Sequence, residues 1–280
     1  MTQQDLFHHV SLKCSRITTS SYSTSFSIGI RCLDKDLRDP IYSIYGFVRF
    51  ADEIVDTFHA HNKRELFDRF KNDTFRAIEN RIDLNPIINS FQETVNKYAI
   101  DHALIRQFLH SMELDLEKTT YDHAGFEEYV LGSAEVVGLM CLQVFCRGDQ
   151  PQYQQLKPLA MKLGSAFQKI NFLRDLKDDY VGLGRMYFPG INLEHFDNDT
   201  KRNIEISIAA DFKAGYAGIK QLPRSSRLGV YVAYLYYLAL FEKIRKTPSS
   251  YIMKCRIRIE NTQKLFILCY SFIRHQLNLI

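Results

Sequence analysis

Two stretches of the sequence place carboxylates at helical spacing. The first has polar residues at intervals of four, three and four, at Tyr45, Arg49, Asp52 and Asp56. Because residues three or four positions apart share one face of an α-helix, both aspartates are expected to point the same way. Their charges repel by roughly a few tenths of a kcal/mol, and Glu53 adds a third carboxylate. The stretch therefore requires positive charge, which Arg49 or a bound Mg²⁺ could supply.

The second stretch repeats this arrangement later in the chain. Its polar residues are spaced by three, four and four, at Gln168, Asn171, Asp175 and Asp179. Apolar residues occupy the adjoining turns, so this polar stripe is expected to border a cavity. Just beyond it, Arg185 and Tyr187 supply a cation and a phenol at the helix end, where the oxygens of a diphosphate could be bound.

A single pair of aspartates at this spacing is usually an ordinary solvated helix face or a surface ion pair. Two such stripes occur here, each with an arginine nearby and each bordered by apolar residues. Together they favour a shared site for a hard metal ion, because all the side chains proposed as ligands offer oxygen.

Helical periodicity extends through most of the chain, and no sustained strand alternation is visible. The seven prolines are expected at starts or breaks of helices, with Pro40 opening the helix of the first stripe. The expected fold class is all-α, with residues 1–280 forming a single domain because no Gly/Ser/Pro-rich linker divides them. The predicted helices span 4–15, 20–30, 39–59, 63–82, 86–99, 101–119, 125–147, 151–180, 201–218, 223–245 and 259–278.

The net charge and the length of the apolar runs limit which kinds of molecule the protein is expected to bind. A net charge of +4 is too weak to imply nucleic acid, but it is compatible with an anionic substrate or with peripheral contact to acidic lipid. The longest apolar run, Val230 to Phe241, has twelve residues, well below the roughly 20 of a membrane-spanning helix. The N-terminal residues lack the pattern of a signal peptide. We therefore expect a cytoplasmic protein that could touch the inner surface of the membrane.

Several other features of the sequence indicate structure and not a functional site. The six cysteines are scattered without C-x-x-C pairs, so they are expected to be reduced and mostly structural. Asp115 and Glu117 could face the same cavity, but a solvated helix face is the more common arrangement. The tyrosines between 231 and 237 have the spacing of an ordinary core helix, and Gly-Leu-Gly at 182–184 lacks the third glycine of a dinucleotide fingerprint.

Four segments that span most of the chain carry a resemblance to a known family. They are SYSTSF (21–26), YGFVRFADEIVD (45–56), YVLGSAEVVG (129–138) and NFLRDLKDDYVGLGRMYFP (171–189). In this order they resemble the squalene/phytoene synthase family, the head-to-head trans-prenyltransferases. The last segment, N-x-x-R-D-x-x-x-D followed by R-x-Y-F-P, is highly specific for that family.

The resemblance implies an isoprenoid-synthase-type helical bundle around a central apolar cavity. It implies that Mg²⁺, or Mn²⁺ in its place, is held by Asp52, Asp56, Asn171, Asp175 and Asp179. The four aspartates would act in catalysis with Tyr45 and Arg49. The residues implied to contact or help ionise the diphosphates are Tyr22, Ser23, Thr24, Ser25, Arg174, Arg185 and Tyr187. Gln168 and Tyr129 would line the reaction cavity, and Tyr237 matches a family position in a less distinctive stretch.

The chain departs from the family pattern in three places. The span from Asp179 to Arg185 is one residue longer, Glu135 replaces a small glycine, and Leu131 replaces a tyrosine. The last two changes could reshape the cavity wall without touching the metal ligands.

The resemblance also implies a reaction. Two prenyl diphosphates would be joined head to head through a cyclopropylcarbinyl diphosphate. We favour phytoene formed from geranylgeranyl diphosphate in carotenoid biosynthesis, because the last segment looks most like bacterial carotenoid-pathway members. The alternatives are dehydrosqualene or squalene synthesis from farnesyl diphosphate, with NADPH expected only for a squalene synthase, and a non-catalytic assembly factor with the same fold. The intact aspartate pairs argue against the last, and the prenyl chain length and oligomeric state stay open.

Overall fold

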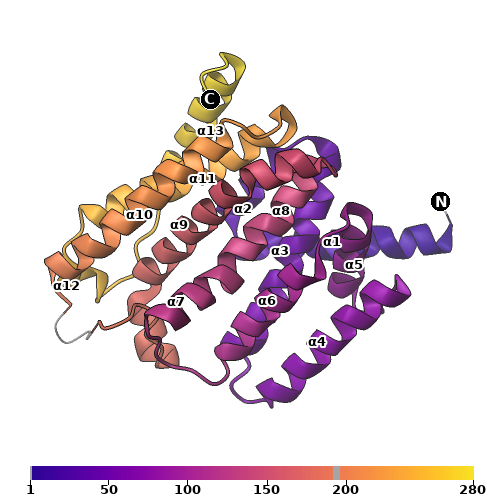
Figure 1. Cartoon of the computed structure of the whole chain (residues 1–280), viewed down its shortest axis with the longest axis horizontal. Helices are drawn as coiled ribbons and strands as arrows, with labels where there is room; N and C mark the ends of the chain where they lie inside the picture. Colours follow the sequence, from indigo (N-terminus) through magenta and orange to yellow (C-terminus); the bar gives the residue numbers. More distant parts are fainter. Residues whose placement is uncertain (1, 192–195) are drawn as a thin grey trace.

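The protein is built almost wholly from helices, as the computed structural model shows for residues 2–191 and 196–280 (Figure 1). No β-strand occurs in these two ranges, so the predicted all-α fold is confirmed. The helices are α1 (Gln3–Tyr22), α2 (Thr24–Arg31), α3 (Lys35–Asp56), α4 (Lys63–Asn80), α5 (Pro86–Tyr98), α6 (His102–Leu114), α7 (His123–Val130), the π-helix η1 (Leu131–Glu135), α8 (Val136–Cys146), α9 (Gln150–Leu183), α10 (Asn198–Ile219), α11 (Arg224–Arg245), α12 (Ser249–Ile252) and α13 (Asn261–Gln276).

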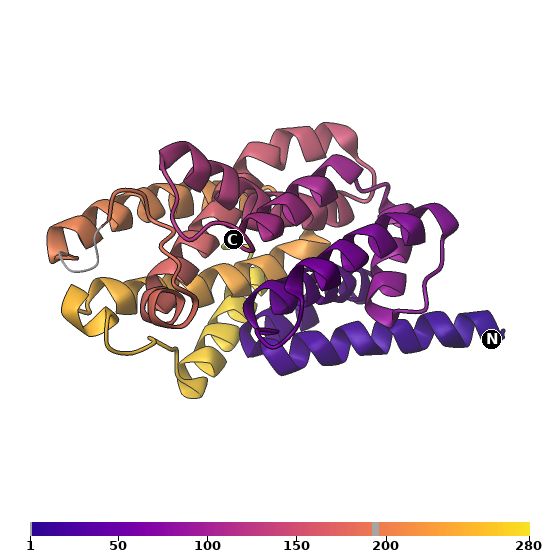
Figure 2. The ribbon, with the colours of Figure 1, turned by 90° about the horizontal axis from the view of Figure 1, so that it is seen from below.

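The long helices α3 and α9 hold the two halves of the fold together. Helix α3 packs against α1, α5 and α8, whereas α9 packs against α8, α10 and η1. Figures 1 and 2 show α1, α3, α4 and α5 on one side of the molecule and α9 to α12 on the other. One buried apolar cluster extends from Ile30 to Ile257, so both halves share a core. At its centre the rings of Phe47 and Phe91 stack with centroids 3.8 Å apart.

The chain bends at Ser23, between α1 and α2, which falls inside the second predicted helix, 20–30. Helix α1 runs on to Tyr22, well past the predicted end at residue 15, and α2 begins at Thr24. Between them Ser23 has extended backbone torsions, and its Oγ accepts a hydrogen bond from the Phe26 amide over 3.2 Å. A capping serine satisfies an amide that the helix itself leaves free, which explains why the break falls at this residue.

Two prolines contradict the prediction that all seven lie at helix starts or breaks. Pro40 sits inside α3, which begins five residues earlier at Lys35, and Pro158 sits inside α9. Each removes one backbone N–H from the helical ladder, so the extensive burial of these long helices must outweigh the loss. Pro86 and Pro151 do occupy first turns.

The predicted helix 125–147 is one rod made of α7, η1 and α8. Its length and composition alone would let His123–Cys146 cross a membrane, but 61% of its most apolar window is buried inside the protein, as in the core helix of a bundle. The π-turn η1 packs closely against α6. A Cβ added to Gly132 would lie 1.9 Å from the Oγ of Ser111 and 2.6 Å from the Gln107 carbonyl oxygen. Only glycine fits this contact without a backbone shift.

We predict that Gly132→Ala lowers the free energy of unfolding by about 1–3 kcal/mol, because the added methyl group overlaps a backbone carbonyl of α6. Gly182→Ala is the matched control, since a Cβ at Gly182 meets no atom within 4 Å. The control should lose no stability and could gain up to about 1 kcal/mol, because alanine favours a helix more than glycine does. Urea unfolding followed by circular dichroism measures both. Equal midpoints for the two variants would contradict the tight η1–α6 contact.

Candidate active site

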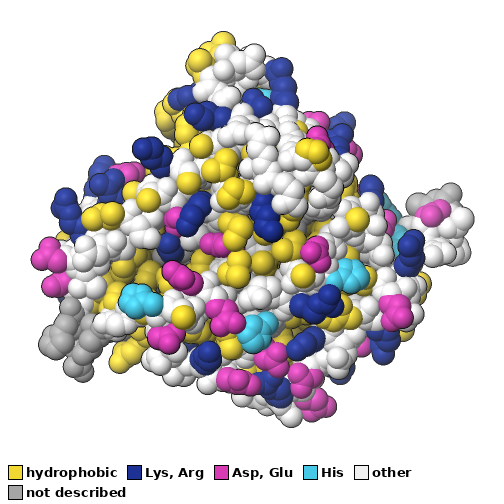
Figure 3. All heavy atoms as spheres, viewed as in Figure 1, with side chains coloured by type: hydrophobic (Ala, Val, Ile, Leu, Met, Phe, Trp, Pro, Cys, Tyr) yellow, Lys and Arg dark blue, Asp and Glu magenta, His cyan; other side chains and the backbone are white. Residues whose placement is uncertain are grey.

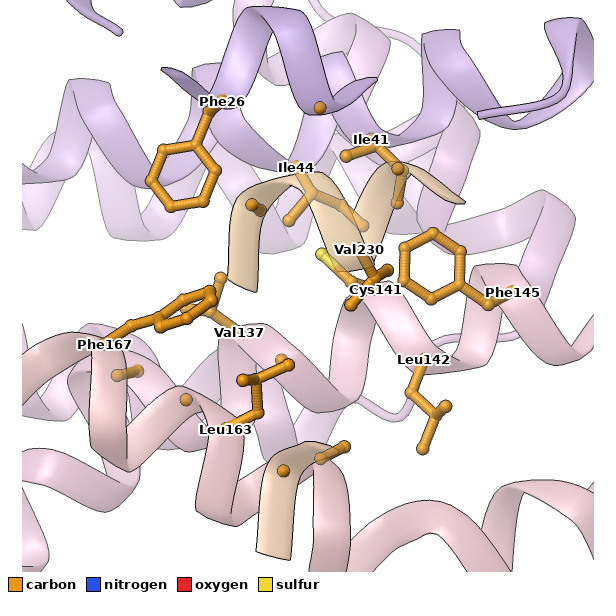
Figure 4. Close-up of a pocket in the computed structure, with 18 of the residues that line it drawn as sticks. Phe26, Ile41, Ile44, Val137, Cys141, Leu142, Phe145, Leu163, Phe167 and Val230 are labelled. Atoms are coloured by element: carbon orange, nitrogen blue, oxygen red, sulfur yellow. The ribbon is translucent and has the colours of Figure 1, made fainter. Parts of the chain in front are cut away.

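An apolar cavity of about 300 Å³ lies between α2, α3, α8, α9, α10 and α11. Figure 4 shows Phe26, Ile44 and Val230 converging on the same space as Leu163 and Phe167. Its described lining is aliphatic, aromatic or glycine apart from Tyr45, Ser133, Gln168, Asn171, Cys141 and Tyr237. Such a lining suits long hydrocarbon chains and excludes water.

Aromatic rings gather at the end of the cavity where Tyr45, Asn171 and Tyr237 lie. The rings of Phe167 and Tyr237 stack with centroids 4.0 Å apart, and Phe26 lies 5.7 Å from the ring of Tyr45. The Tyr237 hydroxyl donates to Asn171 Oδ1 over 3.2 Å, which places the predicted Tyr237 beside the second stripe. Burial, mainly, raises the pKa of Tyr45 to about 12, so this phenol stays protonated at neutral pH.

The first aspartate stripe begins beside this aromatic group, on the last turns of α3. Arg49 donates to Asp52 over 2.5 Å and also pairs with Glu53. Its guanidinium lies 4.2 Å from the centre of the Tyr22 ring, which brings the serine-rich stretch to the stripe. Burial and the neighbouring Asp56 raise the pKa of Asp52 to about 7. One arginine therefore does not offset the charge of this stripe.

The second stripe lies on α9. Arg174 donates twice to the adjacent Asp175, over 2.8 and 2.5 Å, and Arg256 reaches the same carboxylate over 2.8 Å. Burial, Asp175 and then Asp56 raise the pKa of Asp179 to about 8. The Arg185 amide donates to the Asp179 carbonyl oxygen over 2.9 Å, and the Arg185 guanidinium donates to Asp56 over 2.6 Å, so the ends of the two stripes lie close together. The amide of Asn171 meanwhile donates to Gln168 over 3.3 Å.

Arg185 joins the two stripes and is only 5% exposed. It donates to Asp56 over 2.6 Å and to the main-chain oxygens of Val55 and Asp115 over 3.2 and 2.9 Å. The left-handed Gly184 (φ 67°) ends α9 just before it. The next residue, Met186, then donates its amide to the Thr119 carbonyl over 2.7 Å. These bonds fix the segment after α9. They hold the guanidinium of Arg185 against Asp56, the last residue of the first stripe.

Asp115 is the main site residue that the sequence did not reveal. It is buried, contrary to the expected solvated face, whereas Glu117 is exposed and pairs with Arg64. Hydroxyl groups reach Asp115 from Tyr121 (3.2 Å), Tyr129 (2.5 Å) and Tyr187 (3.3 Å). Burial raises its pKa to about 6, although Arg185 opposes this. Asp115 thus anchors a buried network directly beneath Arg185.

Several other residues singled out from the sequence have roles that differ from those expected. Tyr129 does not line the apolar cavity, because its hydroxyl is held by Asp115. The Ser23 side chain caps the N-terminus of α2, and Thr24 and Ser25 are the first two residues of that helix. Neither Glu135 nor Leu131 lines the cavity, so the expectation that these two substitutions reshape its wall is not supported by the structure.

The donor set fits a hard divalent cation, although arginines hold the carboxylates in this structure. Within the two described ranges no group of three His, Cys, Asp or Glu forms a ready-made metal site. All five predicted ligands nevertheless offer oxygen, and neighbouring carboxylates help raise the pKa values of Asp52 and Asp179. Additional positive charge would stabilise the ionised cluster, which is what Mg²⁺ provides.

The chain is similar to known proteins over most of its length. Residues 19–263 match the model of the squalene/phytoene synthase family. The chain is 28% identical to phytoene synthase of Cereibacter sphaeroides over 288 residues, which cover 94% of this chain and 79% of that protein. It is also 27% identical to presqualene diphosphate synthase of Rhodopseudomonas palustris over 168 residues, covering 59% of this chain and 58% of the other.

The fold is similar to that of a solved dehydrosqualene synthase in complex with ligand. That structure superimposes with a TM-score of 0.81 over 96% of this chain and 98% of its own. The sequences are 17% identical, so the likeness concerns the fold alone. With the family match, it confirms the resemblance inferred from the four segments.

We predict that Asp115→Asn lowers the free energy of unfolding by about 3 kcal/mol, because it removes the charge that faces the buried Arg185. Asp73→Asn is the control: Asp73 pairs only with the 64% exposed Arg76 in the described contacts, and its loss should cost less than about 1 kcal/mol. Urea unfolding at neutral pH measures both. Similar small losses would show that the network does not depend on Asp115.

Proposed function

This chain belongs to the squalene/phytoene synthase family of prenyltransferases, and we propose that it joins two geranylgeranyl diphosphates head to head to form phytoene in carotenoid biosynthesis. One observation carries the proposal. Two aspartate stripes from α3 and α9 meet at Arg185, and Asn171 connects the second stripe to the lining of an apolar cavity. A substrate with an anionic head and a long hydrocarbon tail matches both parts of the site.

The described residues of the cavity hold the tails and keep water out. Phe26, Phe167 and Tyr237 form contacting aromatic walls at its polar end. A carbocation formed beside these rings would be shielded from water, which would otherwise quench it. The buried phenol of Tyr45 adds a hydrogen-bond donor at the same end.

The cation expected at the stripes is Mg²⁺, with Mn²⁺ as a substitute, held by Asp52, Asp56, Asn171, Asp175 and Asp179. When bound, it would neutralise the diphosphate leaving group and so ease ionisation of the allylic substrate. The arginines of this chain offer further positive charge: Arg49 and Arg174 sit on the two stripes, and Arg185 lies between them. They would orient the diphosphate oxygens through charge-assisted hydrogen bonds.

Support for geranylgeranyl diphosphate comes from the phytoene synthase relative, whose similarity covers nearly the whole chain. Farnesyl diphosphate remains the alternative substrate, because the presqualene diphosphate synthase relative matches more than half of the chain at nearly the same identity. A non-catalytic assembly factor would need neither aspartate stripe, yet both are complete here.

The direct test is product identification. The purified protein is incubated with Mg²⁺ and either geranylgeranyl or farnesyl diphosphate, with and without NADPH. We expect phytoene from the C20 substrate, no requirement for NADPH, and loss of turnover in excess chelator that Mg²⁺ or Mn²⁺ restores. A C30 hydrocarbon as the main product would replace the substrate assignment. Absence of product from both substrates would contradict catalysis.

The shared site makes a second prediction, that the two stripes act as one unit. Asp52→Asn and Asp179→Asn should each reduce kcat roughly 100-fold or more, because each removes an anionic ligand while keeping its volume. The double variant should lose much less than the product of the two factors. Steady-state turnover measures all three, with circular dichroism as a check on folding.

The matched control is Asp178→Asn, which changes an exposed carboxylate between the stripe positions of α9. Its turnover should stay within about twofold of the unaltered chain. Multiplicative effects in the double variant would show that the two stripes do not serve one site.

A further inference from the structure

Helix α13 is attached to the body along a narrow seam. Its buried side chains are Ile267 and Ser271, and Ile267 packs against Val232 and Tyr236 of α11. The Tyr236 hydroxyl also donates to the main-chain oxygen of Lys264 over 2.9 Å. In Figures 1 and 3 the helix projects from the top of the molecule. Most of its circumference is therefore free of contact with the described residues.

The free side of α13 is apolar. Exposure of its large hydrophobic side chains ranges from 40% at Tyr270 to 70% at Phe266. At 100° per residue, these positions form a continuous arc of about 160° that contains no charged residue. The residues of this arc are Leu265, Phe266, Cys269, Tyr270, Phe272, Ile273 and Leu277, together with Thr262 and Gln276. A surface of this kind on one helix indicates a binding face rather than scattered exposure.

Positive charge borders this face. Residues 243–280 contain eight lysines and arginines but one acidic residue, Glu260. At the same 100° per residue, Arg274 lies about 40° beyond Tyr270 at one edge of the arc, whereas Lys264 lies beside the buried Ser271. Figure 3 shows basic side chains beside the hydrophobic ones on the projecting part. Long basic side chains can lie along an apolar surface while their charged ends reach lipid headgroups.

We propose that the exposed face of α13 docks on an anionic lipid bilayer, with the helix lying in the plane of the interface. An apolar arc bordered by basic residues is complementary to acidic headgroups above acyl chains. A second copy of this chain fits less well, because a twofold contact through the same face would bring the two basic borders together.

If the proposed function holds, docking through α13 would bring the bilayer close to the cavity that binds the prenyl chains. The helix packs on α11, in an apolar cluster that also takes in Ile28 and Cys32 of α2. Other faces of the same two helices line the cavity, through Gly29, Val230 and Ala233. One layer of helices therefore separates the docking face from the space proposed for prenyl chains. A prenyl diphosphate and its hydrocarbon product partition into a bilayer, so docking would shorten their path.

Vesicle flotation of the full chain tests the proposal. Vesicles of phosphatidylcholine with about one-third phosphatidylglycerol are compared with pure phosphatidylcholine at low and high salt. We expect binding to the anionic vesicles that salt weakens. The double variant Phe266→Asp with Ile273→Asp should bind at least about tenfold more weakly, because it places charge in the apolar arc. Leu84→Asp is the matched control, since it changes an 89% exposed leucine outside α13 and should bind normally.

Two further measurements separate the outcomes. Asp175→Ala should float like the unaltered chain, so docking can succeed or fail independently of the proposed catalysis. Light scattering reports a second copy on the same face: a dimer that the α13 double variant dissociates, together with no vesicle binding, would overturn the proposal. Failure of the unaltered chain to bind anionic vesicles, or equal binding by the double variant, would overturn it as well.

Discussion

A surplus of carboxylates beside an apolar cavity is the constraint on which the rest of this structure depends. Asp52 and Asp179 come from different helices, yet burial and neighbouring carboxylates raise the pKa of each. Such a cluster is stable only where positive charge compensates it. Arg185 supplies part of that charge from a buried position between the stripes. The proposed metal ion and diphosphates would rearrange these pairings without adding an unpaired charge.

The fold serves this cluster by fixing the segment that carries Arg185. Its guanidinium is held by Asp56 and by the main chain on either side, and Asp115 supports it from below with three tyrosine hydroxyl groups. A fully hydrogen-bonded buried network of this kind is rigid. On the other side, the close η1–α6 contact at Gly132 supports the rod whose residues line the cavity. The charged residues around Arg185 and the apolar cavity therefore keep fixed positions relative to each other.

The sequence predicted the parts of this arrangement that depend on local spacing. Helical periodicity gave the all-α fold, and the intervals within each stripe placed its aspartates on one face of α3 and of α9. Long-range contacts could not be read in this way. Asp115 lies 70 residues before Arg185, so their pairing appears only in the folded chain. The prolines inside α3 and α9 and the π-turn were missed because tertiary packing there overrides local preference. The cap at Ser23 is local, but hydrophobic periodicity does not reveal which serine ends a helix.

If both stripes hold a diphosphate through a divalent cation, the binding of inorganic pyrophosphate must depend on that cation, which calorimetric titration measures. The full chain is titrated in the presence of Mg²⁺ and again in excess chelator. We expect pyrophosphate to bind well with Mg²⁺ and weakly without it, and by linkage to strengthen Mg²⁺ binding by the same factor. Equal pyrophosphate affinity under both conditions would show that the arginines alone form the anion site and that the stripes hold no metal-bound diphosphate.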